Sequence, residues 1–206
     1  MVKRQDSSGY LYHWVKAVPF LRLKETDYSA AFEVMMQIID DGCLRAGLTM
    51  DKGGHECICL TESPKKMITN DTSKYQPFGF QFTKRELFAL GGRPVIYSPI
   101  RDKALLDPSL HWRFMPFDLD LMSVKNPNGL DFTWEREWRL NEPELFIQDA
   151  RKIYVPNDYY KKQLIDRTNL IVQNSISDYY FGYPDQCVEQ YVDDIHDKIE
   201  VLNIPD

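Results

Sequence analysis

The alternation of apolar and polar side chains along the chain predicts many short strands and few helices. Apolar side chains on every second residue are typical of strands, whereas apolar positions three and four apart are typical of helices. We expect helices after Ser29, from Thr83, from Pro156, and over residues 186–202. We expect strands over residues 11–15, 56–61, 78–82, 94–98, 152–155 and 170–173, and a late strand around Glu137. This pattern favours an α+β fold in which a small curved mixed sheet carries a cleft.

Two of the predicted helices have boundary signals. Ser29 has the residue type of an N-cap, and Asp41-Gly42 is a typical helix end. Thr83 and Glu86 have the spacing of a capping box, and Gly91-Gly92 follows about two turns later.

The late strand, which we expect over residues 131–140, contains an unusual pair of acids. Successive side chains of a strand point to opposite faces, so Glu135 and Glu137 are expected on one face. Trp134, Arg136 and Trp138 are then expected on the other face. A carboxylate on such a strand is either neutralised by a fixed cation or used for chemistry on a ligand that is, or becomes, cationic.

Length and composition place the chain among globular proteins. Its 206 residues are enough to bury one core, so we expect a single domain over residues 1–206. The first residues lack the apolar core of a signal peptide, and no apolar run approaches the ~20 residues that cross a bilayer. Four cysteines are few for a secreted disulfide scaffold. We therefore expect a cytoplasmic protein with reduced thiols and no membrane partner.

The charge distribution limits the mode of nucleic-acid binding. A net charge of −6 argues against a broad, non-specific grip on duplex nucleic acid. Lysines and arginines gather between residues 65 and 103, however, which allows a local basic groove. The sequence contains no Gly-rich turn of a Rossmann domain, no Walker-type loop and no nucleophile elbow.

Four segments, in their order along the chain, resemble DarT-type ADP-ribosyltransferases. Residues 11–14 (Leu-Tyr-His-Trp) look like the first strand of that family, and residues 39–44 look like its helix exit. Residues 75–97 resemble its aromatic strand followed by an arginine and then a tyrosine, although Lys84 and the Gly91-Gly92 helix depart from the pattern. Glu137 stands in the place of the catalytic glutamate on a late strand. The Trp-Glu-x-Glu-Trp-Arg run also looks like abortive-infection proteins of the AbiGi kind and invites comparison with the mRNA-modifying CmdT toxin.

The resemblance implies an ADP-ribosyltransferase-like fold with a central NAD cleft and flanking helices. It further implies a mono-ADP-ribosyltransferase that uses NAD as its substrate and acts as a toxin in phage defence. The expected acceptor is a base of RNA or single-stranded DNA, and a cognate antitoxin protein is an expected partner. A protein acceptor stays an alternative, because it would need less positive charge on the enzyme.

The predicted catalytic residues are Glu137, Arg85 and Glu135. Breaking the bond between nicotinamide and ribose builds positive charge on the ribose, so a fixed carboxylate stabilises the transition state. Glu137 is expected in that role, unless it is simply paired with Arg139 or Arg136 at the surface. Glu135 is expected to orient the acceptor, unless it is solvent-exposed.

Arg85 is expected to clamp the NAD pyrophosphate with its planar guanidinium, with Lys84 as a substitute. The structural alternative for Arg85 is an ordinary first-turn side chain, and for His13 and Tyr97 it is a place in the core. The predicted cofactor-binding residues are Tyr12, His13, Trp14, Thr61, Ser63, Arg85 and Tyr97.

Other kinds of site stay open. His55, Cys57 and Cys59 alternate on one strand and could ligate zinc, although the signal is weak and we predict no metal site. A nuclease could hold magnesium with Asp131, Glu135 and Glu137, but the strand lacks the lysine expected beside such acids. A non-catalytic binding or antitoxin module is the third class.

Overall fold

The computed structural model describes residues 8–16, 28–48, 54–70, 75–124, 127–176 and 182–204. The chain forms two compact units, each built from segments that are far apart in the sequence. The first unit comprises Met1–His13, Leu44–Lys65 and Phe82–Leu145, and the second comprises Trp14–Cys43, Lys66–Gln81 and Phe146–Asp206. Four of the boundaries fall inside β1 (Tyr10–Trp14), β2 (Cys43–Arg45), β5 (Gly79–Thr83) and β10 (Glu144–Phe146), and the fifth lies between Lys65 and Lys66. A single domain over residues 1–206 stays a prediction.

The first unit contains an antiparallel sheet with the strand order β1, β4, β9, β6, and β3 also pairs with β4. β7 and β8 form a separate parallel pair. The strands of this unit are β3 (Gly47–Leu48), β4 (Glu56–Thr61), β6 (Arg93–Pro94), β7 (Ile96–Ser98), β8 (Phe114–Pro116) and β9 (Glu137–Leu140). Its helical segments are α3 (Lys84–Ala89) and the 3-10 helices η1 (Ile100–Leu105), η2 (Pro108–Arg113) and η3 (Thr133–Glu135).

The register of β4 against β9 gives this sheet one apolar and one polar face. Ile58 lies opposite Leu140, and Leu60 lies opposite Trp138, and all four residues are buried. The intervening residues point to the other face, where Cys59 lies opposite Arg139 and Thr61 lies opposite Glu137. The polar pairs are therefore held in place by the packing of the apolar face.

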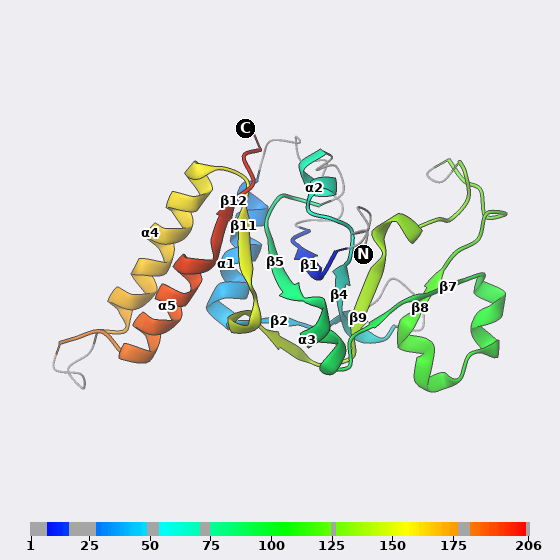
Figure 1. Cartoon of the computed structure of the whole chain (residues 1–206), viewed down its shortest axis with the longest axis horizontal. Helices are drawn as coiled ribbons and strands as arrows, with labels where there is room; N and C mark the ends of the chain where they lie inside the picture. Colours follow the sequence, from blue (N-terminus) through cyan, green and yellow to red (C-terminus); the bar gives the residue numbers. More distant parts are fainter. Residues whose placement is uncertain are drawn as a thin grey trace, which may run out of the picture. The chain divides into compact units, whose positions relative to one another are not determined.

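The second unit is built on a mixed sheet. β11 (Lys152–Val155) pairs antiparallel with β5 and parallel with β12 (Ile199–Val201). Helices α4 (Asp158–Asn174) and α5 (Gln186–Lys198) lie side by side and contact β11 (Figure 1). The other helical segments are α1 (Ser29–Asp41), α2 (Lys66–Asn70) and η4 (Ile147–Asp149).

Aromatic side chains form much of the core of the second unit. The ring of Phe78 lies 5.0 Å from that of Tyr160 and 6.0 Å from those of Tyr28 and Phe32. These edge-on and tilted contacts suit aromatic quadrupoles and bury a large apolar area. Two units of strands and helices confirm the α+β class with a mixed sheet.

Several predicted elements are confirmed with their ends. The predicted strands over residues 56–61 and 152–155 are β4 and β11, and the strands predicted over residues 11–15 and 78–82 are β1 and β5, each shifted by one residue. α1 ends at Asp41, and Gly42 caps it with a positive φ of 73°, the left-handed conformation that glycine adopts without steric cost. Asn157 caps α4 by accepting a hydrogen bond from the backbone of Tyr160.

The predicted strand over residues 170–173 is wrong, because these residues are the last turns of α4. The branched side chains of Ile171 and Val172 favour a strand locally. The helix nevertheless continues through them from Thr168, which is completely buried and whose hydroxyl donates to the backbone carbonyl of Leu164. The helix predicted over residues 186–202 is also too long. It ends at Lys198, because Ile199 begins β12 and pairs with Ile153.

The predicted strand over residues 94–98 is interrupted. Val95 is not paired in β6 or β7, and its backbone N–H donates to the carbonyl of Glu137. Thr83 and Tyr28 occupy the N-cap positions of α3 and α1, and neither donates or accepts a side-chain capping hydrogen bond. The expected capping interaction of Thr83 and the expected N-cap at Ser29 are therefore wrong, although both helices start within one residue of the predicted place.

Within the residues that the structure describes, no helix is both long enough and apolar enough to cross a membrane.

Candidate active site

The acidic segment before β9 is not a continuous strand, as the sequence pattern had predicted. Residues 133–135 form the 3-10 turn η3, and Arg136 then adopts a left-handed conformation with φ 48° and ψ 49°. The side chain of Asp131 starts this turn by accepting hydrogen bonds from the backbone nitrogen and the hydroxyl of Thr133, at 2.8 and 2.7 Å. Such local bonds compete with strand pairing. The expected alternation of Glu135 and Glu137 on one strand face is therefore wrong, because only Glu137 belongs to β9.

Two hydroxyl groups at the end of β4 hold this turn in place. Thr61 donates to the backbone carbonyl of Glu135, and Ser63 donates to the carbonyl of Trp134 at 2.6 Å. The backbone nitrogen of Ser63 in turn donates to the hydroxyl of Thr61 at 3.1 Å. The structure thus brings two predicted cofactor-binding residues next to the acidic segment. Glu135 itself is buried, so the alternative that it is solvent-exposed is wrong.

Glu137 is the first residue of β9 and is 7% exposed. Its Oε1 accepts a hydrogen bond from Nε of Arg139 at 2.7 Å. Its backbone nitrogen donates to the hydroxyl of Tyr97 at 3.0 Å, and that hydroxyl donates to the carbonyl of Phe132 at 3.2 Å. Tyr97 therefore joins the turn to the strand start, and burial raises the pKa of its hydroxyl.

The carboxylate of Glu137 has one fixed and one available oxygen. Among the described residues, Oε2 takes part in no hydrogen bond. No side-chain oxygen or nitrogen of the described residues is both fully shielded from solvent and without a partner, so Oε2 is not completely shielded from solvent. The alternative of a pair between Glu137 and Arg139 is confirmed, but the pair is buried and does not lie at the surface.

Arg139 connects β9 to the backbone of η2 and β8. Its Nη1 donates to the carbonyls of Trp112 and Phe114, both at 2.8 Å, and its Nη2 lies 3.4 Å from the sulfur of Met115. The side chain is only 3% exposed. Glu137 supplies the charge that compensates this buried guanidinium and acts to raise its pKa against the effect of desolvation.

A third buried carboxylate, Glu62, lies on the face of β4 that carries Ile58 and Leu60. Glu62 is 6% exposed, and its Oε1 lies 2.7 Å from Nζ of Lys84 and 3.5 Å from Nη2 of Arg136. Its Oε2 accepts from Nε1 of Trp138 at 3.0 Å, and Lys84 also lies 5.3 Å from the Trp138 ring centre. Lys84 is thus engaged in an internal ion pair. The sequence analysis did not identify this cluster around Glu62, since ion pairs between residues 22 and 74 positions apart leave no local pattern.

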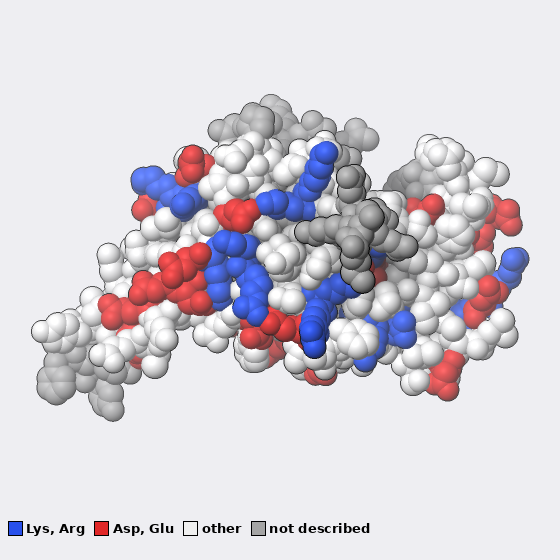
Figure 2. All heavy atoms as spheres, in the orientation of Figure 1, with Lys and Arg blue, Asp and Glu red and all other residues white. Residues whose placement is uncertain are grey.

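Arg85 is exposed on α3, beside the engaged Lys84. In the described part of the chain, no hydrogen bond or ion pair joins Arg85 to Glu137. Figure 2 shows Lys and Arg side chains on the surface in the region of α3. The structure therefore presents Arg85 to solvent without a direct bond to Glu137.

The three residues predicted from β1 are placed differently from one another. Tyr12 lies opposite Thr61 in the sheet register, and its hydroxyl is 3.4 Å from that of Ser8. The Nδ1 of His13 lies 3.0 Å from the carbonyl of Cys59, and burial lowers the pKa of this half-buried imidazole. Trp14 belongs to the second unit, where its ring packs against Tyr154 at 5.6 Å.

The acids and thiols do not form a metal centre in the described residues, where no group of three or more His, Cys, Asp or Glu side chains is arranged to hold an ion. Cys57 and Cys59 lie together, with their sulfurs 4.0 Å apart. His55 instead contacts His111, with ring centres 6.4 Å apart.

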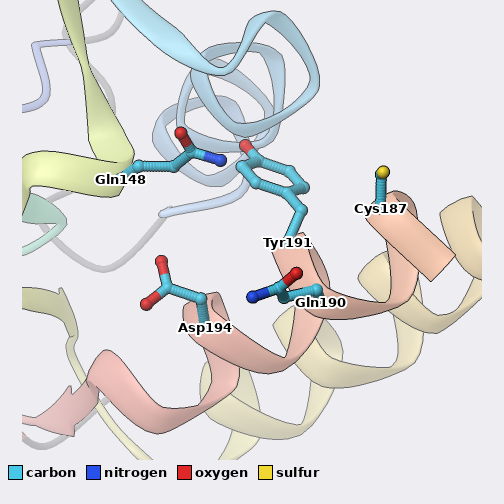
Figure 3. Close-up of a pocket in the computed structure, with 5 residues that line it drawn as sticks. All are labelled: Gln148, Cys187, Gln190, Tyr191 and Asp194. Atoms are coloured by element: carbon cyan, nitrogen blue, oxygen red, sulfur yellow. The ribbon is translucent and has the colours of Figure 1, made fainter.

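A hollow of about 420 Å³ lies on the second unit (Figure 3). Its walls are polar and come mostly from α5, where Tyr191 donates a hydrogen bond to the backbone of Ile39. Ligand pockets are usually lined mainly by apolar side chains, whereas most side chains that line this hollow carry polar groups. The lining residues are Gln148, Cys187, Gln190, Tyr191 and Asp194.

No protein-family model, no curated protein and no solved structure matches this chain.

Proposed function

We propose that the protein is an NAD-dependent mono-ADP-ribosyltransferase whose catalytic carboxylate is Glu137. The observation that carries this proposal is the state of that carboxylate. One oxygen is fixed by Arg139 at 2.7 Å, and the other is not completely shielded from solvent and has no partner among the described residues. A carboxylate that is held rigidly by one oxygen and presents the other is suited to a ligand that develops positive charge.

The proposed reaction starts when the bond between nicotinamide and C1′ of the ribose breaks. The bonding electrons leave with nicotinamide, which becomes neutral, and positive charge develops on the ribose, as in glycoside hydrolysis. Oε2 of Glu137 would accept a hydrogen bond from a ribose hydroxyl and stabilise that charge. A nucleophilic atom of the acceptor then bonds to C1′ and releases its proton, so that ADP-ribose is transferred.

The surroundings of Glu137 support a positioning function for its neighbours. Tyr97 fixes the backbone of Glu137, whereas Thr61 and Ser63 fix the turn before it through backbone carbonyls. Preorganised groups of this kind do not need to reorganise when charge develops. Glu135 follows the exposed ring of Trp134 on η3, and we assign it to orienting the acceptor.

We propose a base of RNA or single-stranded DNA as the acceptor. Trp134 is 47% exposed directly before Glu135 and offers a face on which an unstacked base can stack. Arg85 is an exposed cation, and we assign it to phosphate groups of NAD. The net charge of −6 makes such binding local, and a protein acceptor is the alternative. A role as a phage-defence toxin with a cognate antitoxin is supported by the sequence resemblance alone.

The direct test measures nicotinamide release by the purified full chain incubated with NAD. We expect release by the native protein and a loss of at least about 100-fold in Glu137→Gln, which keeps the shape of the side chain but removes its charge. Glu142→Gln, which removes an exposed carboxylate five residues further on, is the matched control and should leave the rate unchanged. Equal rates in both variants, or no release by the native chain with any acceptor, would refute the proposal.

The acceptor is identified in a parallel experiment. RNA, single-stranded DNA and a protein mixture are incubated separately with enzyme and NAD, and mass spectrometry locates the added ADP-ribose. Addition to nucleic acid alone supports the base acceptor, and addition to protein alone supports the alternative.

A magnesium-dependent nuclease has less support from the geometry. Asp131 is engaged with Thr133, and the described residues contain no three-ligand group of acids around Glu137. Cleavage of nucleic acid with Mg²⁺ in the absence of NAD would favour that function instead.

A further inference from the structure

Two arginines of the first unit bind backbone carbonyls around β6, the last strand in the order of its sheet. Nη1 of Arg93 donates to the carbonyls of Phe88 and Gly92, at 2.8 and 2.7 Å. Nε of Arg113 donates to the carbonyl of Pro94 at 3.1 Å. Gly92 and Pro94 flank Arg93 in the sequence, so both guanidiniums are held against the same short stretch of backbone.

Neither of these two arginines has an acidic partner among the described residues. By contrast, Arg139 in the neighbouring strand β9 is paired with Glu137. Partial burial lowers the pKa of Arg113, and the positive charge of Arg93 acts in the same direction. The two guanidiniums therefore lie close enough to repel each other, and an anion bound between them would relieve that repulsion.

The hydrogen bonds leave one side of each guanidinium available to a ligand. Arg93 presents Nε and Nη2, and Arg113 presents Nη1 and Nη2, since none of these nitrogens bonds to a described residue. Each such pair of N–H groups forms a planar fork that matches two oxygens of a phosphate. Cζ of Arg93 also lies 4.0 Å from the ring centre of Phe88, so stacking helps to fix the orientation of this fork.

The surroundings of the two arginines suit a single nucleic-acid strand. The ring of Phe88 beside Arg93 is 52% exposed. Proteins that bind single strands combine cations along the backbone with aromatic rings on which bases stack. Arg93 lies opposite Arg139 in the register of β6 against β9, which places it diagonally to Glu137. Diagonal neighbours in a sheet are about 7–8 Å apart, so the two arginines lie near the candidate catalytic carboxylate.

We propose that Arg93 and Arg113 form a phosphate-binding site for the backbone of single-stranded nucleic acid, an inference that rests on the proposed transfer of ADP-ribose to a base. Phosphate contacts position a strand without reading its sequence. The site holds the acceptor strand beside β9, so that a neighbouring base can reach Glu137.

The test measures binding of the full chain, without NAD, to a labelled single-stranded RNA of about 16 nucleotides and to the matching DNA. Fluorescence anisotropy gives the binding constant at a series of salt concentrations. Each phosphate contact of a single strand contributes about 0.7 to the slope of log K against log salt concentration. For the double variant with Arg93→Gln and Arg113→Gln, we expect a slope smaller in magnitude by about 1.4 and an affinity at low salt weaker by at least about 10-fold.

Arg101→Gln is the matched control, because it removes an exposed arginine of the same unit that is paired with Asp102. This variant should leave the slope unchanged. A second double variant, with Arg93→Lys and Arg113→Lys, keeps both charges but removes the planar forks. It should keep the slope of the native chain and lose affinity, which separates the role of the charges from a general disturbance of the fold.

The proposal is overturned when the native chain binds neither probe, or when the glutamine double variant has the slope of the native chain. It is also overturned when that variant loses affinity only for NAD, measured by calorimetry, because the arginines would then bind the pyrophosphate of NAD. Nicotinamide release without a change in slope would overturn this inference and leave the transferase proposal standing. A change in slope without nicotinamide release would support the phosphate site and refute the transferase proposal.

Discussion

The buried pair of Glu137 and Arg139 leads to a quantitative prediction for the first unit. Arg139→Met keeps a long unbranched side chain but removes the guanidinium. The carboxylate of Glu137 then remains without its hydrogen-bond donor, and the carbonyls of Trp112 and Phe114 lose theirs. Because Arg139 binds the backbone of both η2 and β8, the packing of this segment against the sheet should loosen as well.

The expected cost follows from burial. Arg139 is 3% exposed and Glu137 is 7% exposed, so solvent screens the pair little. Removing one partner of a buried pair typically costs about 3–5 kcal/mol, and we expect about 4 kcal/mol off the free energy of unfolding. The two lost bonds to the carbonyls of Trp112 and Phe114 contribute less than their full value, because these carbonyls can turn toward water.

A double-mutant cycle separates charge from packing. Glu137→Gln alone should cost less than Arg139→Met, because the amide oxygen can still accept from the guanidinium. The double variant should be more stable than the sum of the two single changes predicts, by at least about 1 kcal/mol, since neither charge is then left buried alone.

Urea unfolding followed by tryptophan fluorescence measures these values. A cost below about 1 kcal/mol for Arg139→Met, as for an exposed ion pair, would refute the inference that the pair is buried. Strict additivity in the cycle would refute the direct coupling of the two charges.

Three further predictions concern other places in the fold. Lys84→Met should lower the free energy of unfolding by about 1–3 kcal/mol, because it removes the nearest cation from buried Glu62, whereas Arg85→Met on the same helix should leave urea stability unchanged. Gly129→Ala should cost at least about 1 kcal/mol in thermal unfolding, since φ is +86° and the added Cβ would lie 2.6 Å from a backbone carbonyl oxygen. Burial lowers the pKa of His196 from 6.5, so the unfolded chain binds more protons below that pH and native stability should fall as the pH drops from 7 toward 5. His196→Gln should flatten this pH dependence in urea titrations, and an unchanged slope would contradict the assignment.

The sequence predicted best those elements whose signals are local. β4 and β11 have the predicted ends, because each is a short run of apolar residues bounded by polar or turn-forming residues. α1 and α4 were predicted for the same reason, since their buried positions follow helical spacing and their ends carry glycine and asparagine. Boundaries failed where pairing with a distant segment competes with the local preference, as it does for Ile199 in β12.

The candidate site was predicted only in part. The sequence identified Glu137, Glu135, Thr61, Ser63 and Tyr97, and the structure brings these residues together at the start of β9. It also identified the pairing of Glu137 with Arg139 as an alternative. The anchoring of Arg139 to backbone carbonyls had no sequence signal, because any residue type has a carbonyl.

By itself, the sequence determined the α+β class, the main strands and the residue types available for chemistry, since periodicity and capping act over a few neighbouring positions. Only the tertiary structure decided that the acidic segment leaves the extended conformation before β9 and that Glu137 is buried with one oxygen fixed. It also decided that Lys84 forms an ion pair with Glu62. These outcomes depend on which distant groups share a buried environment, where an uncompensated charge or an unmade hydrogen bond is costly. A local pattern of side chains does not contain that information.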